Sequence, residues 1–335
     1  MIKKTKYESV TFEKEQIQEK VSILVVCYND FDLIKDLYDD IRAQSYSAVE
    51  TIWVLNDKDK NSKEFLKEKN EIIVQPEDNC WYSGGNNLAA SKSSGEYLFV
   101  LNPDTRIEQN TIEELVKSAK MTEAAVYVPK TMCEPNRKII DSIGKSISIG
   151  GWAGRIGAGE RNKGQYDMPL IVPAFDGAAF MIRRSVVEEI GFFDNRFNVF
   201  EETNDLSFRL YGSDYRIVTV PNSLVYHYGG KSYKNTLSRS IKFQYYGVRN
   251  DIIAILKNFN WLFLLFLLPI HIIWPLRAAA SLFINKEFEL AIMRIKGLIA
   301  GLLLGMKSIN RNLTLEQQYN IIFNLPTRLH SNPSE

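Results

Sequence analysis

The chain has 335 residues, 45% of them hydrophobic and 24% charged, and its 41 Lys and Arg nearly balance its 40 Asp and Glu. These proportions exclude a chain that is disordered, collagen-like or coiled-coil throughout. The net charge of +1 disfavours a protein built mainly to bind nucleic acid, which needs a basic excess. Three widely spaced cysteines, Cys27, Cys80 and Cys133, fit neither a disulfide framework nor a CxxC metal site. We therefore expect a globular protein of a reducing compartment with no nucleic-acid partner.

Strands and helices alternate through the first hundred residues. Residues 1–20 are polar, lack the apolar core of a signal peptide and are expected to form an N-terminal leader. The continuous apolar run Val21–Cys27 predicts a strand buried on both faces, and helical spacing predicts a helix over Phe31–Gln44. The elements predicted next are strands at Thr51–Leu55, Glu71–Gln75 and Tyr97–Leu101 and helices at Ser62–Lys69 and Ser83–Ser93. This alternation predicts an α/β fold with a mainly parallel, Rossmann-like sheet flanked by helices.

The second half has a weaker pattern. Strand pieces are expected at Ala125–Pro129 and Met181–Ile182, and the Gly-rich residues 146–170 are expected to form a flexible loop over the site. A helix is predicted from Val186 to Ile190 and another starting at Asp205. The strand Tyr215–Val220 is expected to end at Pro221, because proline lacks a backbone donor.

The densest apolar sequence lies near the C-terminus, at Trp261–Ile284 and Leu290–Met306. The first stretch has the length of a membrane-spanning helix, but Pro269 and Pro275 favour a bent element lying on or re-entering a membrane. A buried helical hairpin in a soluble domain and a homodimer interface are the alternatives. Basic residues suited to a membrane surface lie in or beside this segment: Arg277, Lys286, Arg294, Lys296, Lys307 and Arg311.

Ligands of parallel α/β sheets bind at the carboxyl ends of the strands. That rule selects four polar loops, Tyr28–Asp30, Asn56–Asp57, Asn79–Asn87 and Asn102–Asp104. In the last, Asp104 could bind a divalent cation together with a diphosphate, or could simply be a turn residue. Within the third, the run Gly84-Gly85-Asn86-Asn87 predicts a tight turn into a helix N-terminus, where backbone N–H groups could face a phosphate.

Two further groups could take part in chemistry. Glu201, Glu202 and Asp205 precede a predicted helix, where a carboxylate could be a general base or merely complement the helix dipole. His227 follows an apolar strand and could bind a metal or phosphate, although a lone histidine is more often structural. Neither GxGxxG, a P-loop, zinc-ligand spacing nor a GxSxG elbow occurs, which disfavours NAD or ATP binding, a zinc hydrolase and a serine hydrolase.

Several motifs occur in order between Val21 and Asn250: VSILVVCYND, TIWVLND, NCWYSGGNNLAASKSSGEYLFVLNPDTRI, DGAAFMIRRSVVEEIGFFDNRF, FEETNDLSFRL, VPNSLVYHYGGKS and YYGVRN. The series resembles the family 2 glycosyltransferases, in particular their rhamnosyltransferase-like branch. The resemblance implies a GT-A fold over residues 21–250, followed by a helical, membrane-associated segment over residues 251–335. It also implies a nucleotide-sugar donor and inversion at the anomeric carbon.

The resemblance assigns roles residue by residue. Tyr28, Asn29 and Asp30 would flank the nucleotide base, and Asp57 would contact the base or ribose. The donor would also be contacted by Gly84, Gly85, Asn86, Asn87, Asn102, Asp176 and Arg249, the last near its diphosphate. Asp104 matches the last acid of a DxD-type metal motif whose first acid is Asn102 here, and His227 matches a histidine that helps to bind the metal in some relatives. The implied cofactor is Mg²⁺ or Mn²⁺.

The general base departs from the family pattern. Relatives read Glu-Asp-x-Asp-Leu, whereas this chain reads Glu-Glu-Thr-Asn-Asp-Leu, and an ungapped alignment puts Thr203 at the base position. A one-residue shift puts Glu202 there, so Glu202 is the first candidate and Asp205 the second, with Glu201 beside them.

The expected function is therefore an inverting, metal-assisted glycosyltransferase of cell-surface glycan synthesis, located at the inner face of the cell membrane. Its donor would be dTDP-rhamnose or a UDP- or GDP-linked sugar, and its acceptor a glycan or a lipid-linked glycan. A non-catalytic sugar-nucleotide-binding or scaffold protein on the same fold is the alternative, favoured by the altered acid cluster. A nucleotidyltransferase is disfavoured, because the loop after the first strand lacks a Gly-rich, basic signature.

Overall fold

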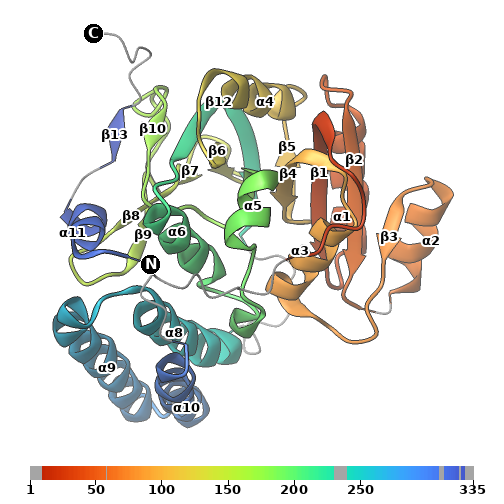
Figure 1. Ribbon diagram of the computed structural model, residues 1–335. Helices are drawn as coiled ribbons and strands as arrows, with labels where there is room; N and C mark the ends of the chain where they lie inside the picture. Colours follow the sequence, from red (N-terminus) through yellow and green to blue (C-terminus); the bar gives the residue numbers. More distant parts are fainter. Residues whose placement is uncertain (1–9, 58, 230–239, 309–312, 324–325, 329–335) are drawn as a thin grey trace, which may run out of the picture.

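The computed structural model describes residues 10–57, 59–229, 240–308, 313–323 and 326–328. These residues form an α/β body around one large sheet, and a group of C-terminal helices lies beside it (Figure 1). The strands are β1 (Ile17–Cys27), β2 (Val49–Leu55), β3 (Ile72–Val74), β4 (Gly95–Leu101), β5 (Thr105–Ile107), β6 (Val126–Cys133), β7 (Ile140–Ser142), β8 (Lys145–Ile147), β9 (Ala153–Arg155), β10 (Leu170–Ile171), β11 (Ala179–Arg183), β12 (Ile217–His227) and β13 (Thr327–Arg328).

The helices alternate with these strands and then follow them. They are α1 (Phe31–Arg42), α2 (Lys60–Glu68), α3 (Trp81–Ser91), α4 (Thr111–Met121), α5 (Arg184–Ile190), the 3₁₀ turn η1 (Asn195–Phe197), α6 (Glu202–Gly212), the π-helical turn η2 (Phe243–Gly247), α8 (Val248–Asn258), α9 (Trp261–Ile284), α10 (Phe288–Met306) and α11 (Leu315–Phe323). The α/β class predicted from the alternation is confirmed.

The large sheet is mixed rather than wholly parallel. Its order is β13-β10-β12-β6-β11-β4-β1-β2-β3, with β5 paired to β12 and β7 to β6. Strands β1–β4 pair in parallel, as does β6 with β12, but β11 runs antiparallel to both β4 and β6. The segment that precedes β11 therefore reaches the same sheet edge as the carboxyl ends of its neighbours. That edge is where the polar loops of the first half also lie.

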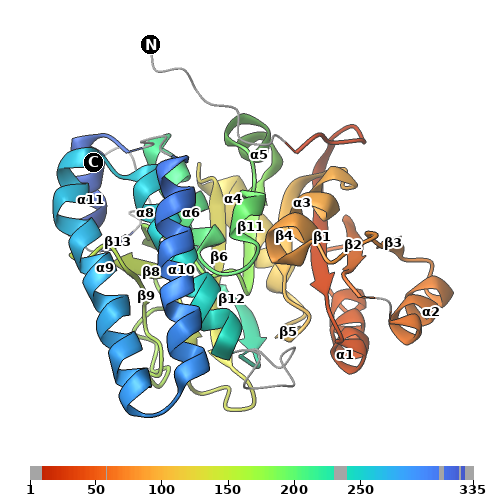
Figure 2. The ribbon, with the colours of Figure 1, turned by 90° about the horizontal axis from the view of Figure 1, so that it is seen from below.

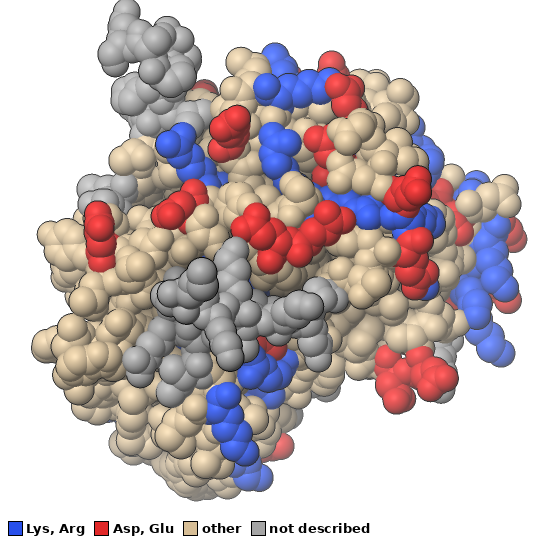
Figure 3. Space-filling model, viewed as in Figure 1, with Lys and Arg blue, Asp and Glu red and all other residues tan. Residues whose placement is uncertain are grey.

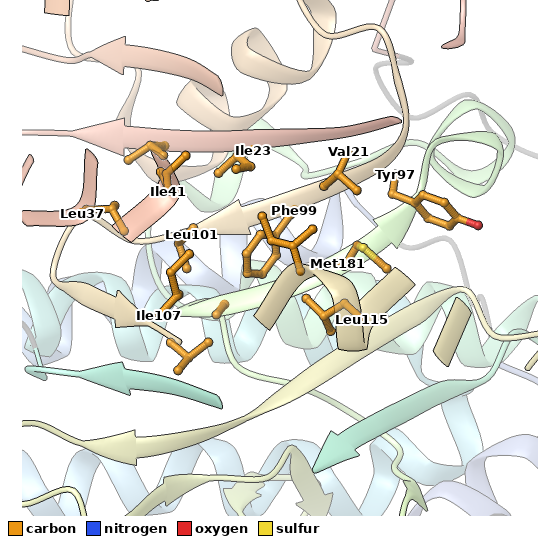
Figure 4. Packing of buried hydrophobic residues seen from close by; sticks show 14 of the residues in the cluster. Val21, Ile23, Leu37, Ile41, Tyr97, Phe99, Leu101, Ile107, Leu115 and Met181 are labelled. Carbon is orange, nitrogen blue, oxygen red and sulfur yellow. The ribbon is translucent and has the colours of Figure 1, made fainter. Parts of the chain in front are cut away.

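The packing around β1 explains why the run Val21–Cys27 is continuously apolar. Val21 and Ile23 belong to a cluster with Leu37 and Leu115 of α1 and α4, whereas Leu24 belongs to a second cluster on the other face, with residues of α3, α5 and α6. Figure 4 shows part of the first cluster. Because helices cover both faces, side chains of either parity are buried, and the prediction of a doubly buried strand is confirmed.

Several boundaries differ from those expected. β1 begins at Ile17, within the expected leader, and β12 continues through Pro221 to His227. The proline is accommodated where the register between β12 and β6 shifts, between Val220 and Leu224. The Gly-rich residues 146–170 were expected to be a loop, but part of them pairs as the β8–β9 hairpin.

The C-terminal apolar sequence forms two long helices that pack side by side and against α8 (Figure 2). α9 is continuous for 24 residues with both Pro269 and Pro275 inside it. α10 meets α8 through glycines spaced four apart: a Cβ on Gly301 would lie 2.7 Å from the Arg249 carbonyl oxygen, and one on Gly305 would lie 2.6 Å from Leu256 Cδ1. Only glycine lets the two backbones approach this closely.

Candidate functional site

A cavity of about 820 Å³ opens at the sheet edge formed by the carboxyl ends of the parallel strands. This is an ordinary size for a small-molecule site, and the location is where α/β sheets bind ligands. Its walls include Tyr28, Asn29, Asp30, Asn56, Asn79, Trp81, Tyr82, Asn102, Asp104, Lys145, Arg155, Asp176, Val199, Phe200, Glu201, Glu202, Thr203, His227 and Lys242. All four polar loops selected from the sequence contribute to this cavity in full or in part.

The loops after β1 and β2 are tied to each other. The Asp30 carboxylate accepts a hydrogen bond of 2.8 Å from the Tyr28 backbone N–H, and the Asp57 carboxylate accepts one from the Asn29 backbone N–H. Asp57 thus lies behind the cavity wall and shapes the loop that lines it. Asn56 similarly fixes the start of α3, because its side-chain amide donates to the Trp81 carbonyl at 2.9 Å.

Asp104 and His227 face one another across one side of the cavity. His227 Nε2 lies 3.5 Å from Asp104 Oδ1, and its Nδ1 lies 2.9 Å from Asp141 Oδ2. Burial alone would lower the pKa of His227, but the hydrogen bonds with Asp104 and Asp141 raise it to about 9. Two carboxylates therefore make this spot attractive to positive charge.

A divalent cation fits this pair. Mg²⁺ takes one or two protein ligands beside substrate phosphates and water, and a ligating histidine commonly has its other nitrogen bound to a carboxylate, as Asp141 binds His227 here. No cluster of three or more His, Cys, Asp or Glu suited to a metal occurs among the residues that the structure describes. Any cation here would thus depend on Asp104, His227 and the donor's own oxygens.

Asp176 lies in a basic cradle on the other side of the cavity. Its Oδ1 is 3.1 Å from Arg155 Nε and 3.5 Å from Lys145 Nζ, and its second oxygen accepts a hydrogen bond from Ser142. Burial alone would raise the pKa of Asp176, but Lys145 and Arg155 lower it. Asp176 is therefore held as a carboxylate beside two cations, Lys145 and Arg155, that sequence patterns had not singled out.

Glu202 begins α6 and is the carboxylate best suited to accept a proton. It is buried, with its side chain only 7% exposed, and its Oε2 has no hydrogen-bond partner among the described residues. Burial raises the pKa of Glu202 to about 7. A side chain with these properties at a cavity wall is a candidate general base.

The loop that delivers Glu202 is held in an unusual backbone conformation. Asn198, Phe200 and Glu201 all have positive φ, at 60°, 67° and 66°. Asn250 of α8 stabilises this loop, because its side-chain amide donates to the carbonyl groups of Phe197, Val199 and Phe200 at 2.6–2.9 Å. Strain held in place by a buried amide is typical of functional loops.

Arg249 does not reach the donor side of the cavity, contrary to the sequence-based expectation. Its guanidinium donates to the Arg196 and Phe197 carbonyl groups and packs 4.6 Å from the Tyr246 ring. It therefore supports the same loop as Asn250. Among the described residues, the basic side chains that line the cavity are Lys145, Arg155 and Lys242.

Asp205 also lies away from the cavity, which argues against it as the base. It is fully buried and is bonded to Arg209 at 3.0 Å and to Lys257 at 2.9 Å. This network joins α6 to α8. Glu201 does line the cavity, but its carboxylate accepts a hydrogen bond of 2.5 Å from Asn204.

The run Gly84-Gly85-Asn86-Asn87 is not a turn at a helix N-terminus, because α3 begins at Trp81 and the run lies inside it. A Cβ on Gly85 would lie 2.6 Å from Val26 Cγ1, so the glycine permits close packing of α3 on β1. The Asn87 amide donates to the Phe193 carbonyl at 2.7 Å. These four residues pack behind the cavity instead of lining it.

Sequence reasoning missed Lys145, Arg155, Asp141 and Lys242. Lys145 and Arg155 lie on three-residue strands, which are too short to leave a periodic signal. The spacing Gly297-x₃-Gly301-x₃-Gly305 was a readable signal of close helix packing.

Comparisons with known proteins identify relatives in sequence and in fold. The O-antigen biosynthesis protein RfbC of Myxococcus xanthus is 28% identical over 221 residues, which is 62% of this chain and 17% of that protein. The low-salt glycan biosynthesis hexosyltransferase Agl10 of Haloferax volcanii is 25% identical over 207 residues, which is 61% of this chain and 65% of that protein. The alignments thus leave more than a third of each relative unmatched.

A solved structure shares the fold over most of the chain. The mannosyltransferase PcManGT of Pyrobaculum calidifontis, in complex with GDP-Man and Mn²⁺, superposes with a TM-score of 0.54 and 15% identity over 90% of this chain and 91% of that one. This supports the GT-A fold expected from the motifs. The model of the family described as "Glycosyl transferase family 2" matches residues 22–191, a span that runs from within β1 through β11 and includes Asp104 and Asp176. On that match, which covers half of the sequence, the chain belongs to glycosyl transferase family 2.

Proposed function

We propose that the protein is an inverting glycosyltransferase that moves a sugar from a nucleotide-sugar donor to a glycan or lipid-linked glycan acceptor. The observation that carries this proposal is that one cavity holds both a buried glutamate with a raised pKa, Glu202, and the adjacent side chains of Asp104 and His227. The first can accept a proton, and the second can hold a cation beside a diphosphate. The placement of Glu202 favours an enzyme over a non-catalytic sugar-nucleotide-binding protein.

The mechanism is a single displacement. An acceptor hydroxyl attacks the anomeric carbon from the face opposite the diphosphate, and Glu202 takes the hydroxyl proton as the new C–O bond forms. The bond to the nucleoside diphosphate breaks in the same step, so the configuration inverts. A bound Mg²⁺ or Mn²⁺ would supply positive charge to the departing diphosphate. Tyr28, Asn29 and Asp30 would hold the nucleotide, and Asp176 in its basic cradle would orient sugar or acceptor hydroxyls.

Donor binding is tested by thermal unfolding of the full chain with a panel of dTDP-, UDP- and GDP-sugars and Mn²⁺, dTDP-rhamnose first. A ligand at about 100 times its Kd stabilises the folded state by about 2.7 kcal/mol, so the true donor should raise Tm by several degrees. The free sugars are the control. A panel that leaves Tm unchanged, together with no sugar transfer, would contradict the proposal.

We propose that α9 and α10 lie on the inner face of the cell membrane. α9 is long and apolar enough to cross a membrane, and 22% of its most apolar window is buried. Large apolar side chains are exposed along both helices: Trp261, Leu265, Phe266, Ile273, Trp274, Ile284, Phe288, Ile292, Ile299, Leu303 and Met306. In Figure 3 the lower left of the face, where α9 lies in the same view, is mostly uncharged, whereas Lys and Arg side chains lie at its lower centre.

Basic side chains accompany this apolar face. Arg277, Lys286, Lys296 and Lys307 are exposed on or beside the two helices; Arg311 lies outside the described residues. An apolar helix face accompanied by cations suits an anionic lipid surface. The alternative of a homodimer interface predicts an oligomer in detergent-free solution.

The membrane proposal predicts that the protein co-sediments with anionic phospholipid vesicles. The double variant Phe266→Ser with Trp274→Ser should weaken this binding at least about tenfold, because each side chain loses apolar burial in the interface. Met121→Ser is the matched control, since Met121 is 75% exposed on α4. Equal binding by the double variant and the control would contradict the proposal that α9 lies on the membrane surface.

A further inference from the structure

His271 is a buried polar residue in the apolar helix α9. Its side chain is fully buried, with Nδ1 2.5 Å from Asp251 Oδ2 on α8 and Nε2 2.7 Å from the Gly150 carbonyl oxygen. With Asp251 ionised, both partners are acceptors, so each ring nitrogen donates and the ring is an imidazolium. Burial alone would lower the pKa of His271, but the hydrogen bond with Asp251 raises it. The two bonds are charge-assisted and therefore strong.

Gly150 belongs to the tip of the β8–β9 hairpin. Around it, the Ser148 N–H donates to the Trp152 carbonyl at 2.9 Å, and the Trp152 ring lies 4.6 Å from the His271 ring, centre to centre. Gly151 has φ +80°, and a Cβ there would lie 3.2 Å from Ile255 Cδ1 of α8. The tip is thus seated directly on α8 and α9, with His271 as its polar anchor.

The other end of the same hairpin forms a wall of the cavity. Lys145 and Arg155 are directly paired across β8 and β9, and both hold Asp176. Lys145 Nζ also donates to Asn204 Oδ1 of α6 at 3.1 Å, two residues after Glu202. A two-stranded element therefore runs from His271 to the part of the cavity beside the proposed base.

This side of the cavity is built from other elements than the nucleotide loops, although Arg155 Nη1 also donates to Asp141 Oδ1, behind His227, at 2.8 Å. Tyr28 and Asn56 come from the ends of β1 and β2, whereas Lys145, Arg155 and Glu202 come from β8, β9 and α6. Because the base must touch the acceptor hydroxyl, the hairpin lies on the acceptor side. His271 does not line the cavity, so it acts on a ligand there through other residues, of which the hairpin is bonded to it directly.

We propose that His271 is a positioning residue for the acceptor side of the site. It anchors the tip of the β8–β9 hairpin to α8 and α9 and thereby sets the places of Lys145 and Arg155 around Asp176. The kinetic part of this inference rests on the proposed glycosyl transfer, whereas the anchoring itself does not.

The test compares His271→Leu with Asp251→Asn in the full chain. Leucine removes both hydrogen bonds at similar volume. In Asp251→Asn, a neutral His271 keeps its Nε2–H bond to Gly150 and accepts from the new amide at Nδ1, so the anchor persists. We expect amide exchange in peptides covering residues 145–155 to rise at least about tenfold in His271→Leu, with exchange in α3 and β4 unchanged. Asp251→Asn should stay within about threefold of the parent protein.

Kinetics provide the second readout. In His271→Leu, the KM for the acceptor should rise at least about fivefold while the Kd for the donor, by calorimetry, stays within about twofold. Unchanged hairpin exchange in His271→Leu, or a rise in donor Kd without one in acceptor KM, would overturn the proposal. If exchange rises throughout α8, α9 and α10, the variant has lost its fold. His271→Asn, whose shorter amide cannot make both bonds, then decides: unchanged hairpin exchange overturns the anchor, and a rise confined to the hairpin supports it.

The two proposals fail in different ways. A protein that transfers no sugar from any donor contradicts the proposed function, yet the exchange experiment still reports whether His271 holds the hairpin.

Discussion

Glu202→Gln is expected to lower kcat for sugar transfer by about 10²–10⁴-fold, the usual loss when a general base is removed. The amide keeps the size of the side chain but cannot take the acceptor proton. Donor affinity should be unchanged, because the proposed nucleotide-binding residues Tyr28, Asn29 and Asp30 follow β1, whereas Glu202 begins α6. Single-turnover transfer and donor calorimetry on the same variant separate the two quantities.

Glu201→Gln is the matched control for this variant. It makes the same change one residue earlier, on a carboxylate that also lines the cavity but is already bonded to Asn204. We expect a loss smaller than about tenfold there. Near-normal turnover in Glu202→Gln, or a larger loss in Glu201→Gln, would move the base to Glu201.

Asp205→Asn should instead lower Tm, because Lys257 and Arg209 would lose their buried partner.

The raised pKa of Glu202 gives the same assignment a pH signature. A base works when deprotonated, so kcat/KM should rise with pH and level off above about 7, the pKa that burial gives Glu202 in the ligand-free protein. The effect on stability has the opposite sign. Between the ordinary value of 4.5 and about 7, the folded state binds more protons at this group than the unfolded state, so its contribution to stability falls as pH rises.

Elements with a strong local pattern were predictable from the sequence. The doubly buried run of β1 and the polar residues at strand ends, such as Tyr28 and Asp104, are set by burial and by sheet geometry. Those two rules were enough to predict that the loops after β1, β2 and β4 lie at one edge of the sheet, although Asp57 in the loop after β2 does not line the cavity. Glu202 was found in another way, as one of three neighbouring acids before a predicted helix, and the family resemblance ranked it first.

The remaining assignments depended on contacts between distant segments. Asp205 and Arg249 looked like site residues because they lie in motifs, yet their partners are Lys257 and the Phe197 carbonyl group, which are 52 residues away in each case. The direction of a side chain from a helix is set by where the helix begins, and α6 begins three residues before the expected start. Lys145 and Arg155 reach the cavity only because a short hairpin is seated on α8 and α9.

Asp104→Asn is expected to weaken divalent-metal affinity by more than about 100-fold and to abolish the dependence of donor binding on Mg²⁺ or Mn²⁺. The amide keeps the shape of the turn but removes the charge that faces His227 at 3.5 Å. Metal affinity typically falls about 10–100-fold when a residue that orients a metal ligand is changed, so the substitution of a direct ligand should lower it further. Donor calorimetry with each metal, and with a chelator, measures both effects.

Asp141→Asn is the matched control, because Asp141 contacts His227 Nδ1 and lies behind it. It should cause an intermediate loss of about 10–100-fold in metal affinity, so that the parent protein, Asp141→Asn and Asp104→Asn form a graded series. An equal or larger loss in Asp141→Asn would mean that orienting His227 matters more than the Asp104 carboxylate. If donor affinity in the parent protein does not depend on metal, the proposal of a bound cation is wrong.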